Sequence, residues 1–271
     1  MFRNTMLNFY RFIFARPFFQ KFNMCIFQLS LRSLGVLNYE NDKVSGERYF
    51  IKKIFPQLIN KKSPVFLDVG ANVGDYTLSL LRTHSSAHIY TFEPHVSNFS
   101  VLKDNVFFPN VKHYNLAAGE SKGELTLYDR ADHKNGSSHA SLYEGVISEI
   151  HKQNVLKFSV SVDTLDNFCE SEKIDEIELL KVDVEGNELA VLNGAKRMIE
   201  NGKIRCIHFE FNEMNVVSRS FFRDFRKILK DYDLYRLLPS GLILLNESPI
   251  FTELFAYQNI IAIPKNIKIM I

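Results

Sequence analysis

The chain has 271 residues, of which 46% are hydrophobic and 24% are charged. This composition is typical of a globular protein with a substantial core and excludes a mainly disordered chain. The 33 basic and 31 acidic residues leave a net charge of +2, so no global field favours nucleic acid as a partner. The three cysteines never stand at metal-ligand spacing, which argues against a zinc site.

The first expected element is a basic, aromatic helical arm over residues 1–44. Residues 1–39 contain no acidic residue, and phenylalanines alternate with positive charges through residue 27. Such a pattern is typical of a helix that lies in a membrane interface, and Pro17 should break the helix in two. Two interpretations stay open. The arm rests on anionic lipid and brings the site to a lipid-linked acceptor, or it buries its aromatic side chains against the domain or in a homodimer.

No run of about 18 apolar residues could span a bilayer. Arg11, Arg16 and Pro17 interrupt any secretory signal core. We therefore expect a cytoplasmic protein, with peripheral contact at the inner face of a membrane if the arm binds lipid.

From about residue 64 the chain alternates short apolar runs with helical patterns, which predicts a parallel sheet covered by helices on both faces. The expected elements are strand 65–69, helix 75–82, strand 88–92, helix 96–106, strand 111–117, strand 177–182, helix 188–200, strand 204–209, helix 221–230, and strands 234–245 and 255–263. This order predicts one α/β domain over residues 45–271, Rossmann-like, with a mostly parallel seven-stranded sheet that ends in an antiparallel pair. Residues 120–160 are predicted to form a β-rich insertion near the substrate mouth.

A glycine loop follows the first strand, between Asp68 and Gly74. Gly70 and Gly74 are expected to let the backbone approach a ligand without obstruction. The loop lacks the full GxGxxG pattern and the Lys-Ser/Thr end of a phosphate-binding loop, which disfavours a triphosphate. Glu93 ends the second strand, where a carboxylate in such folds accepts hydrogen bonds from both ribose hydroxyls.

Two acids beside one glycine loop suit a ligand that carries an amino group, a ribose and a sulfonium cation, whereas they would repel a pyrophosphate. S-adenosylmethionine (SAM) is such a ligand. The alternative without a ligand is that Asp68 caps the following turn and Glu93 is a solvated strand end. Because both acids flank the same loop, we favour the nucleoside site.

Six segments between about Ser45 and Ile263 resemble the FkbM family of methyltransferases. They are Ser45-Gly46-Glu47, the loop from Asp68 to Gly74 with Asn72 where many methyltransferases have glycine, Phe92-Glu93-Pro94, Asn115 to Gly119, Ser161 to Asp166, and Leu180 to Glu188. The last segment is similar to the family's Lys-x-Asp-x-Glu-Gly-x-Glu signature. The resemblance implies a class I methyltransferase that uses SAM, usually methylates oxygen, and has sugars and secondary metabolites among its acceptors.

The same resemblance assigns positions in the site. The residues implied to hold the methionine end of the cofactor are Asp68, Gly70, Asn72 and Gly74. Those implied at the ribose are Glu93 and Pro94, and those beside the adenine are Leu116 and Ala117. Asp183 would lie near the methyl group, at the carboxyl end of a strand, where the crevice of an open α/β sheet opens.

Methyl transfer from a sulfonium to a neutral hydroxyl needs alignment, exclusion of water and a base. The candidate bases are Asp183, Glu185 and Glu210. Glu185 and Glu188 could instead be acids that a helix dipole favours at an N-terminus.

Asp183, Glu210 and Asn212 end adjacent predicted strands and could also form an oxygen-ligand site for Mg²⁺. The arrangement looks like that of the metal-dependent catechol O-methyltransferases. We favour a site without metal, because paired carboxylates at strand ends are common without one. His133 and His139 could serve as bases, but a histidine in a polar loop is more often simply exposed.

Two other functions stay open. A nicotinamide-dependent oxidoreductase also uses a glycine loop and a ribose acid, but the Asn72 loop and the absence of a separate substrate domain disfavour it. A catalytically silent module could retain the cofactor fold as a scaffold for the arm. The predicted partner is a small molecule or a glycan, either free or lipid-linked.

Overall fold

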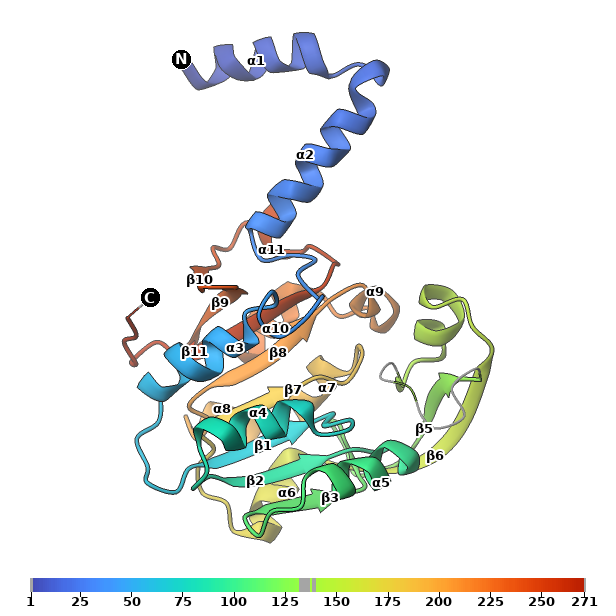
Figure 1. Ribbon diagram of the computed structural model, residues 1–271, viewed down its shortest axis with the longest axis vertical. Coiled ribbons are helices and arrows are strands. Elements are labelled where there is room, and N and C mark those ends of the chain that lie inside the picture. Colours follow the sequence, from blue (N-terminus) through green and yellow to red (C-terminus); the bar gives the residue numbers. More distant parts are fainter. Residues whose placement is uncertain (1, 132–136, 138–139, 271) are drawn as a thin grey trace.

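The structure, a computed structural model, describes residues 2–131, 137 and 140–270 (Figure 1). Within these residues the main sheet has eight strands in the order β10-β9-β11-β8-β7-β1-β2-β3. The parallel strands are β1 (Val65–Val69), β2 (His88–Phe92), β3 (Val111–Tyr114), β7 (Leu179–Val182) and β8 (Ile207–Phe211). The antiparallel side is formed by β11 (Gln258–Pro264), β9 (Tyr232–Leu238) and β10 (Gly241–Leu244). This topology confirms the predicted α/β fold.

Helices cover both faces of the sheet, as the apolar runs predict. β1 shows why, because Phe66 packs on one face and Leu67 on the other, each at most 1% exposed. Phe66 packs in one cluster with residues of α4 (Asp75–Thr83) and α5 (Val96–Asn105). The same cluster includes the helical turns η2 (Phe50–Ile54) and η3 (Phe55–Gln57), which follow α3 (Glu47–Tyr49). Leu67 packs in the cluster that contains α6 (Leu165–Glu172), α7 (Glu188–Asn193), α8 (Lys196–Glu200) and α10 (Phe222–Ile228).

Two predicted elements are divided. The strand expected over 234–245 folds back at Pro239 and Gly241 into β9 and β10, which adds an eighth strand to the seven expected. The helix expected over 188–200 is interrupted at Gly194 and Ala195, between α7 and α8. Two backbone segments approach closely at this point, since a Cβ on Gly194 would lie 2.0 Å from the carbonyl oxygen of Gly119.

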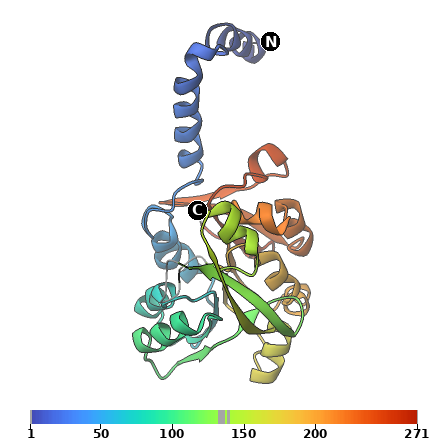
Figure 2. The ribbon, with the colours of Figure 1, turned by 90° about the vertical axis from the view of Figure 1, so that its right-hand side faces the viewer.

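The insertion forms a second sheet of three strands. β5 (Gly123–Arg130) and β6 (Val155–Asp163) pair as an antiparallel ribbon, with η4 (Val146–Ile150) in the connection between them. β6 also pairs in parallel with β4 (Ala117–Ala118). The strand predicted over 111–117 therefore ends at Tyr114, and its last residue belongs to the second sheet. Figure 2 shows this ribbon standing beside the main sheet.

The amino-terminal arm projects from the domain (Figures 1 and 2). α2 (Gln20–Ser33) leaves the domain as a single helix, and α1 (Phe2–Phe14) crosses its far end after a turn, η1 (Pro17–Phe19). The predicted break at Pro17 is confirmed. The chain packs on the domain only after α2, where Val36 is fully buried. No helix among the described residues is long and apolar enough to cross a membrane.

Candidate active site

The glycines of the first loop are required by packing of the protein on itself. Gly70 has φ +84°, and a Cβ there would lie 1.7 Å from the carbonyl oxygen of Asp183. Gly74 has φ +96°, and its Cβ would lie 2.4 Å from a methyl group of Val106, the residue that directly follows α5. Side chains here would collide with the protein before they met any ligand, which corrects the reason we gave for these glycines. The loop is thereby fixed against the end of β7.

Asn72 and Glu93 join the first loop to the end of β2. Asn72 adopts a left-handed conformation (φ +48°) that asparagine tolerates well. Its backbone N–H donates to Glu93 Oε2 at 2.9 Å, and the N–H of His95 donates to Oε1 at 2.8 Å. Burial raises the pKa of Glu93 to about 7. Each carboxylate oxygen accepts only one of these bonds and keeps a lone pair for a ligand hydroxyl.

Asp68 lies behind the loop. Its Oδ2 accepts a hydrogen bond from Thr77 Oγ1 at 2.5 Å, and burial raises its pKa to about 6. Among the described residues, neither Asp68 nor Gly74 lines the large cavity at this edge of the sheet. Both support the loop from behind, and their direct contact with a cofactor stays a prediction.

The large cavity has a volume of about 560 Å³ and brings the remaining predicted residues together. Its first end, which we call the cofactor end, is lined by Gly70, Asn72, Glu93, Pro94, Leu116 and Ala117. Its second end, which we call the acceptor end, is lined by Asp183, Glu185, Glu210, Asn212, Met214, Tyr39 and Tyr257.

The insertion closes the cofactor end from outside. The carbonyl oxygen of Ser137 accepts from Asn98 Nδ2 at 3.0 Å and from Asn72 Nδ2 at 3.5 Å. The N–H of Ser137 donates to Asp129 on β5 at 3.0 Å. The insertion thus contacts the cofactor loop directly. His133 and His139, which we considered as bases, lie outside the described residues.

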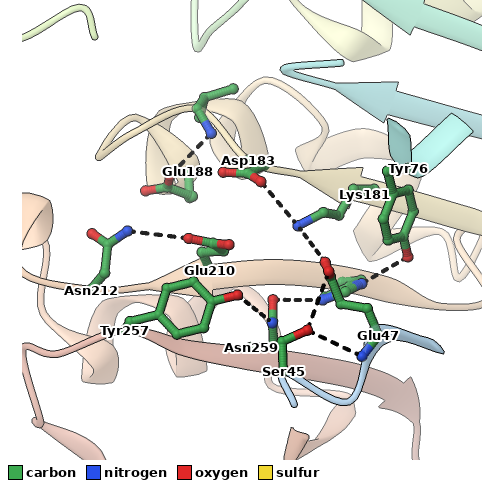
Figure 3. Close-up of polar contacts among 12 residues, drawn as sticks. Ser45, Glu47, Tyr76, Lys181, Asp183, Glu188, Glu210, Asn212, Tyr257 and Asn259 are labelled. Atoms are coloured by element: carbon green, nitrogen blue, oxygen red, sulfur yellow. Dashed lines mark hydrogen bonds and ion pairs between the residues drawn. The ribbon is translucent and has the colours of Figure 1, made fainter. Parts of the chain in front are cut away.

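Asp183 at the acceptor end has a buried cationic partner. Lys181 Nζ lies 3.4 Å from Asp183 Oδ2 and 3.8 Å from Glu47 Oε1 (Figure 3). Burial alone would lower the pKa of Lys181, but the carboxylates of Asp183 and Glu47 raise it. Burial raises the pKa of Glu47. The ammonium of Lys181 therefore supplies the positive charge that a buried acidic cluster needs.

Glu210 is the second acid at the acceptor end. Burial and the neighbouring Asp183 raise its pKa well above the ordinary value, and Asn212 Nδ2 donates to its Oε2 at 3.4 Å. Its environment therefore favours the neutral form of the Glu210 carboxyl group more than water does.

Glu185 and Glu188 have different surroundings. Glu185 lines the cavity with a left-handed backbone (φ +51°), and its carbonyl accepts from Ser141 Oγ at 2.7 Å. Glu188 is 1% exposed and accepts from the N–H of Gly186 at 3.0 Å and from Asn215 Nδ2 at 3.2 Å. Glu188 thus holds the turn after β7, as its position at the helix N-terminus suggests.

A chain of hydrogen bonds runs beneath the acceptor end (Figure 3). Tyr76 Oη is 2.8 Å from His208 Nδ1, His208 Nε2 is 2.8 Å from Asn259 Oδ1, and Asn259 Nδ2 is 3.0 Å from Tyr257 Oη. Burial lowers the pKa of His208 well below its ordinary value, so the ring is neutral. Since Asn259 Oδ1 can only accept, Nε2 carries the hydrogen, and each group donates to the next. The Tyr257 hydroxyl accepts from Asn259 and can donate its own hydrogen to the cavity.

The magnesium alternative has less support at this site. Among the described residues no three histidine, cysteine, aspartate or glutamate side chains are grouped to hold a metal. Asp183 already contacts the Lys181 ammonium. The absence of metal from the reaction stays a prediction.

Several residues of the acceptor end had no role in the sequence-based prediction. Lys181 had a signal, because residues two apart on a strand point to the same face, so Lys181 and Asp183 were bound to be neighbours. Tyr39, Tyr257 and Asn259 had none, since they come from the segment between α2 and α3 and from the start of the last strand or the residue before it.

The parallel sheet, the buried acid at the end of β2 and the apolar wall beside it define a class I methyltransferase that uses SAM. The residues fit this cofactor, because Glu93 has both oxygens available for ribose hydroxyls and Leu116 and Ala117 give an apolar surface for adenine. A family model described as the methyltransferase FkbM domain matches residues 68–236, more than half of the chain. The chain belongs to the FkbM methyltransferase family, which sets aside the nicotinamide alternative.

Named relatives are distant. The chain is 24% identical over 196 residues to the 2-O-methyltransferase NoeI of Sinorhizobium fredii, a match that covers 68% of this chain and 78% of that protein. It is 27% identical over 195 residues to the methyltransferase sdnD of Sordaria araneosa, covering 57% and 74%. Among solved structures, an FkbM methyltransferase from Methylobacillus flagellatus matches with a TM-score of 0.46 and 15% identity, covering 79% of this chain and 49% of that one.

Proposed function

We propose that this methyltransferase transfers the methyl group of SAM to a hydroxyl oxygen of a sugar, a glycan or a related metabolite. One observation carries the proposal. The Asp183 carboxyl group lines the cavity beside the cofactor loop, with Lys181 Nζ 3.4 Å from its Oδ2, and Glu210 lines the same cavity. A carboxyl oxygen in this position can accept the proton of a hydroxyl group that enters the cavity.

The cofactor supplies an activated methyl group, bound to a sulfonium, so the protein has to align the acceptor and receive one proton. We assign the hydroxyl proton to Asp183 Oδ as the new carbon–oxygen bond forms and the bond between the methyl carbon and sulfur breaks, which would leave S-adenosylhomocysteine as the neutral thioether product. The Lys181 ammonium holds the Asp183 carboxyl group in place, and Glu210 can form a hydrogen bond with a second acceptor hydroxyl. Glu185 lines the same wall and stays an alternative base.

The acceptor end combines aromatic and hydrogen-bonding groups, which suits a polyhydroxylated ring. The rings of Tyr39 and Tyr257 meet edge to face with centroids 6.0 Å apart. Tyr257 offers a donor hydroxyl, and Asn212 offers an amide beside Glu210. A few polar groups placed among apolar ones are typical of small-molecule sites. The name of NoeI, a 2-O-methyltransferase, also supports methylation of oxygen.

The test is turnover with SAM that carries an isotope-labelled methyl group, offered with a panel of neutral and amino sugars, oligosaccharides and phenols. We expect a labelled methyl ether on a sugar hydroxyl, detected by mass spectrometry, and loss of this product in Asp183→Asn. Asp104→Asn, which removes an exposed acid on α5, is the matched control and should keep activity.

Three results would contradict the proposal. Label on the nitrogen of an amino sugar would overturn methylation of oxygen. Label on phenols alone would overturn the sugar class. Tight binding of S-adenosylhomocysteine without turnover on any acceptor would favour the silent scaffold.

A further inference from the structure

The arm contains two sets of aromatic residues with different environments. The first set joins α1 to α2: Phe14 lies 4.8 Å from Tyr10, 5.1 Å from Phe19 and 5.5 Å from Phe22, measured between ring centroids. Asn23 strengthens the joint, because its Nδ2 donates to the carbonyl of Phe14 at 2.8 Å and its Oδ1 accepts from the Tyr10 hydroxyl at 3.1 Å. α1 is therefore held across the end of α2 by specific contacts.

The second set is left in solvent. Met6 is 56% exposed, Phe9 64% and Phe12 72%, and Phe18 at the bend is 89% exposed. Arg11 and the asparagines of α1 lie on the other side of the helix. An exposed patch of large apolar side chains marks a surface that binds a membrane or another protein.

The charges of the arm identify what covers it. The first 39 residues have no acid, and the Arg16 guanidinium lies over the exposed Phe12 ring, with its Cζ 5.5 Å from the ring centroid. An aromatic face flanked only by cations matches the boundary of an anionic lipid layer, where rings enter the acyl region and cations meet phosphate groups. We propose that residues 2–33 dock the enzyme on an anionic membrane surface, with α1 lying in the interface and α2 as the support.

A second copy of the arm would be a poor partner. Pairing two arms through their exposed faces would bring the Arg16 side chains of both chains together, and the first 39 residues contain no acid to balance them. The domain of the same chain does not cover them either, because α2 carries α1 away from it (Figure 2).

The base of the arm adjoins the acceptor end of the cavity. The N–H of Leu37 donates to the carbonyl of Tyr257 at 2.8 Å, and Arg236 Nη1 donates to the carbonyl of Leu34 at 3.4 Å. Tyr39, which follows, lines the cavity. Docking of the arm would therefore hold the acceptor end at a set distance from the lipid surface. This step rests on the proposed function and implies an acceptor attached to lipid.

The experiment is flotation of the full chain with vesicles of phosphatidylcholine alone or mixed with phosphatidylglycerol. We expect recovery with the anionic vesicles only, and a lower recovery at high salt because the cations are screened. Phe9→Ser with Phe12→Ser should lower recovery about tenfold or more, since two phenylalanines no longer leave water. The matched control is Phe107→Ser with Phe108→Ser, which removes two exposed aromatic residues from the opposite side of the domain.

Equal recovery of the Phe9/Phe12 variant and the unchanged chain would overturn the proposal. The proposal would also be overturned if the chain did not bind vesicles and instead formed a concentration-dependent dimer that required Phe9 and Phe12. The double variant Arg11→Glu with Lys21→Glu separates electrostatic attraction from burial of apolar side chains. It should abolish the preference for anionic lipid while α1 keeps its apolar face.

A second measurement separates docking from chemistry. With an acceptor sugar in solution, the Phe9/Phe12 variant should turn over at the rate of the unchanged chain. With the same sugar on a lipid in anionic vesicles, it should be about tenfold slower. Flotation without any turnover would remove the proposed function but leave docking intact, whereas equal rates on the lipid-borne sugar would remove the lipid-attached acceptor.

Discussion

The two ends of the cavity are built in different ways. The cofactor end is formed by successive segments of the chain between Gly70 and Ala117, with Asn72 joined to Glu93 by one hydrogen bond. The acceptor end consists of side chains from separate elements, with Tyr39 following the arm and Tyr257 preceding the last strand. On the proposed assignment, segments close together in the sequence hold the cofactor, and segments far apart in the sequence select the acceptor. Substitutions at the cofactor end should therefore change the Kd for S-adenosylhomocysteine, whereas substitutions at the acceptor end should change kcat or the KM for the acceptor.

The largest expected effect is on turnover, at the acceptor end. Asp183→Asn removes the proton acceptor but keeps the shape of the side chain, so kcat should fall about a thousandfold. Binding of S-adenosylhomocysteine, measured by calorimetry, should change only a few-fold. An equal loss in both constants would show that Asp183 belongs to the cofactor end.

The matching change at the cofactor end is Glu93→Ala. Two charge-assisted hydrogen bonds to the ribose would be lost, so the Kd for S-adenosylhomocysteine should rise about a hundredfold. Calorimetry checks this value, and the fold can be monitored by circular dichroism. Unchanged affinity would exclude Glu93 as the ribose ligand.

The pH dependence of cofactor binding tests whether the Glu93 carboxylate binds the ribose, without any change in the size of the side chain. Its pKa in the free enzyme is about 7 because it is buried. Ribose hydroxyls donate to the ionised form, so affinity is full above this pKa and falls as the pH drops through it. Between about pH 8 and about pH 6 the affinity for S-adenosylhomocysteine should fall about tenfold. Glu93→Gln should remove the dependence, while a dependence that persists would belong to Asp68, with its pKa of about 6.

The smallest expected effect concerns Tyr257→Phe. The acceptor loses one hydroxyl partner, so its KM should rise about fivefold, with the Kd for S-adenosylhomocysteine unchanged. The buried Asn259 amide also loses its acceptor, which should lower the free energy of unfolding by about 1 kcal/mol, as measured by urea denaturation. A loss of stability with an unchanged KM would make the hydroxyl purely structural.

The fold was predictable where local patterns decide it. Strands β1 and β2 and the start of α4 follow from apolar runs and the glycine loop, and both strands were predicted with the bounds observed. The close approach of Gly194 to Gly119 was not predictable, because the two residues lie far apart in the sequence. The split of the strand near Gly241 had a local signal in Pro239 and Gly241.

The same division applies to the candidate site. Its motif residues share the cavity, with Asp68 and Gly74 behind the loop. The groups that surround Asp183 come from remote segments, and Tyr76 and His208, for example, are 132 residues apart in the chain. A periodic pattern contains no information on such pairs, because the fold alone brings them together.

The contact between Gly70 and Asp183 has a consequence for how this enzyme can change. The absence of a side chain at Gly70 lets the backbone of Asp183 rest on the loop that follows β1. A substitution that displaces this loop should therefore also displace Asp183, the proposed proton acceptor. Energetic effects at these two positions should be coupled in a double-mutant cycle, with a combined loss smaller than the sum of the two. We therefore expect variation in acceptor preference at Tyr39 and Tyr257 of the acceptor end, because these residues can be exchanged without displacing the loop or Asp183.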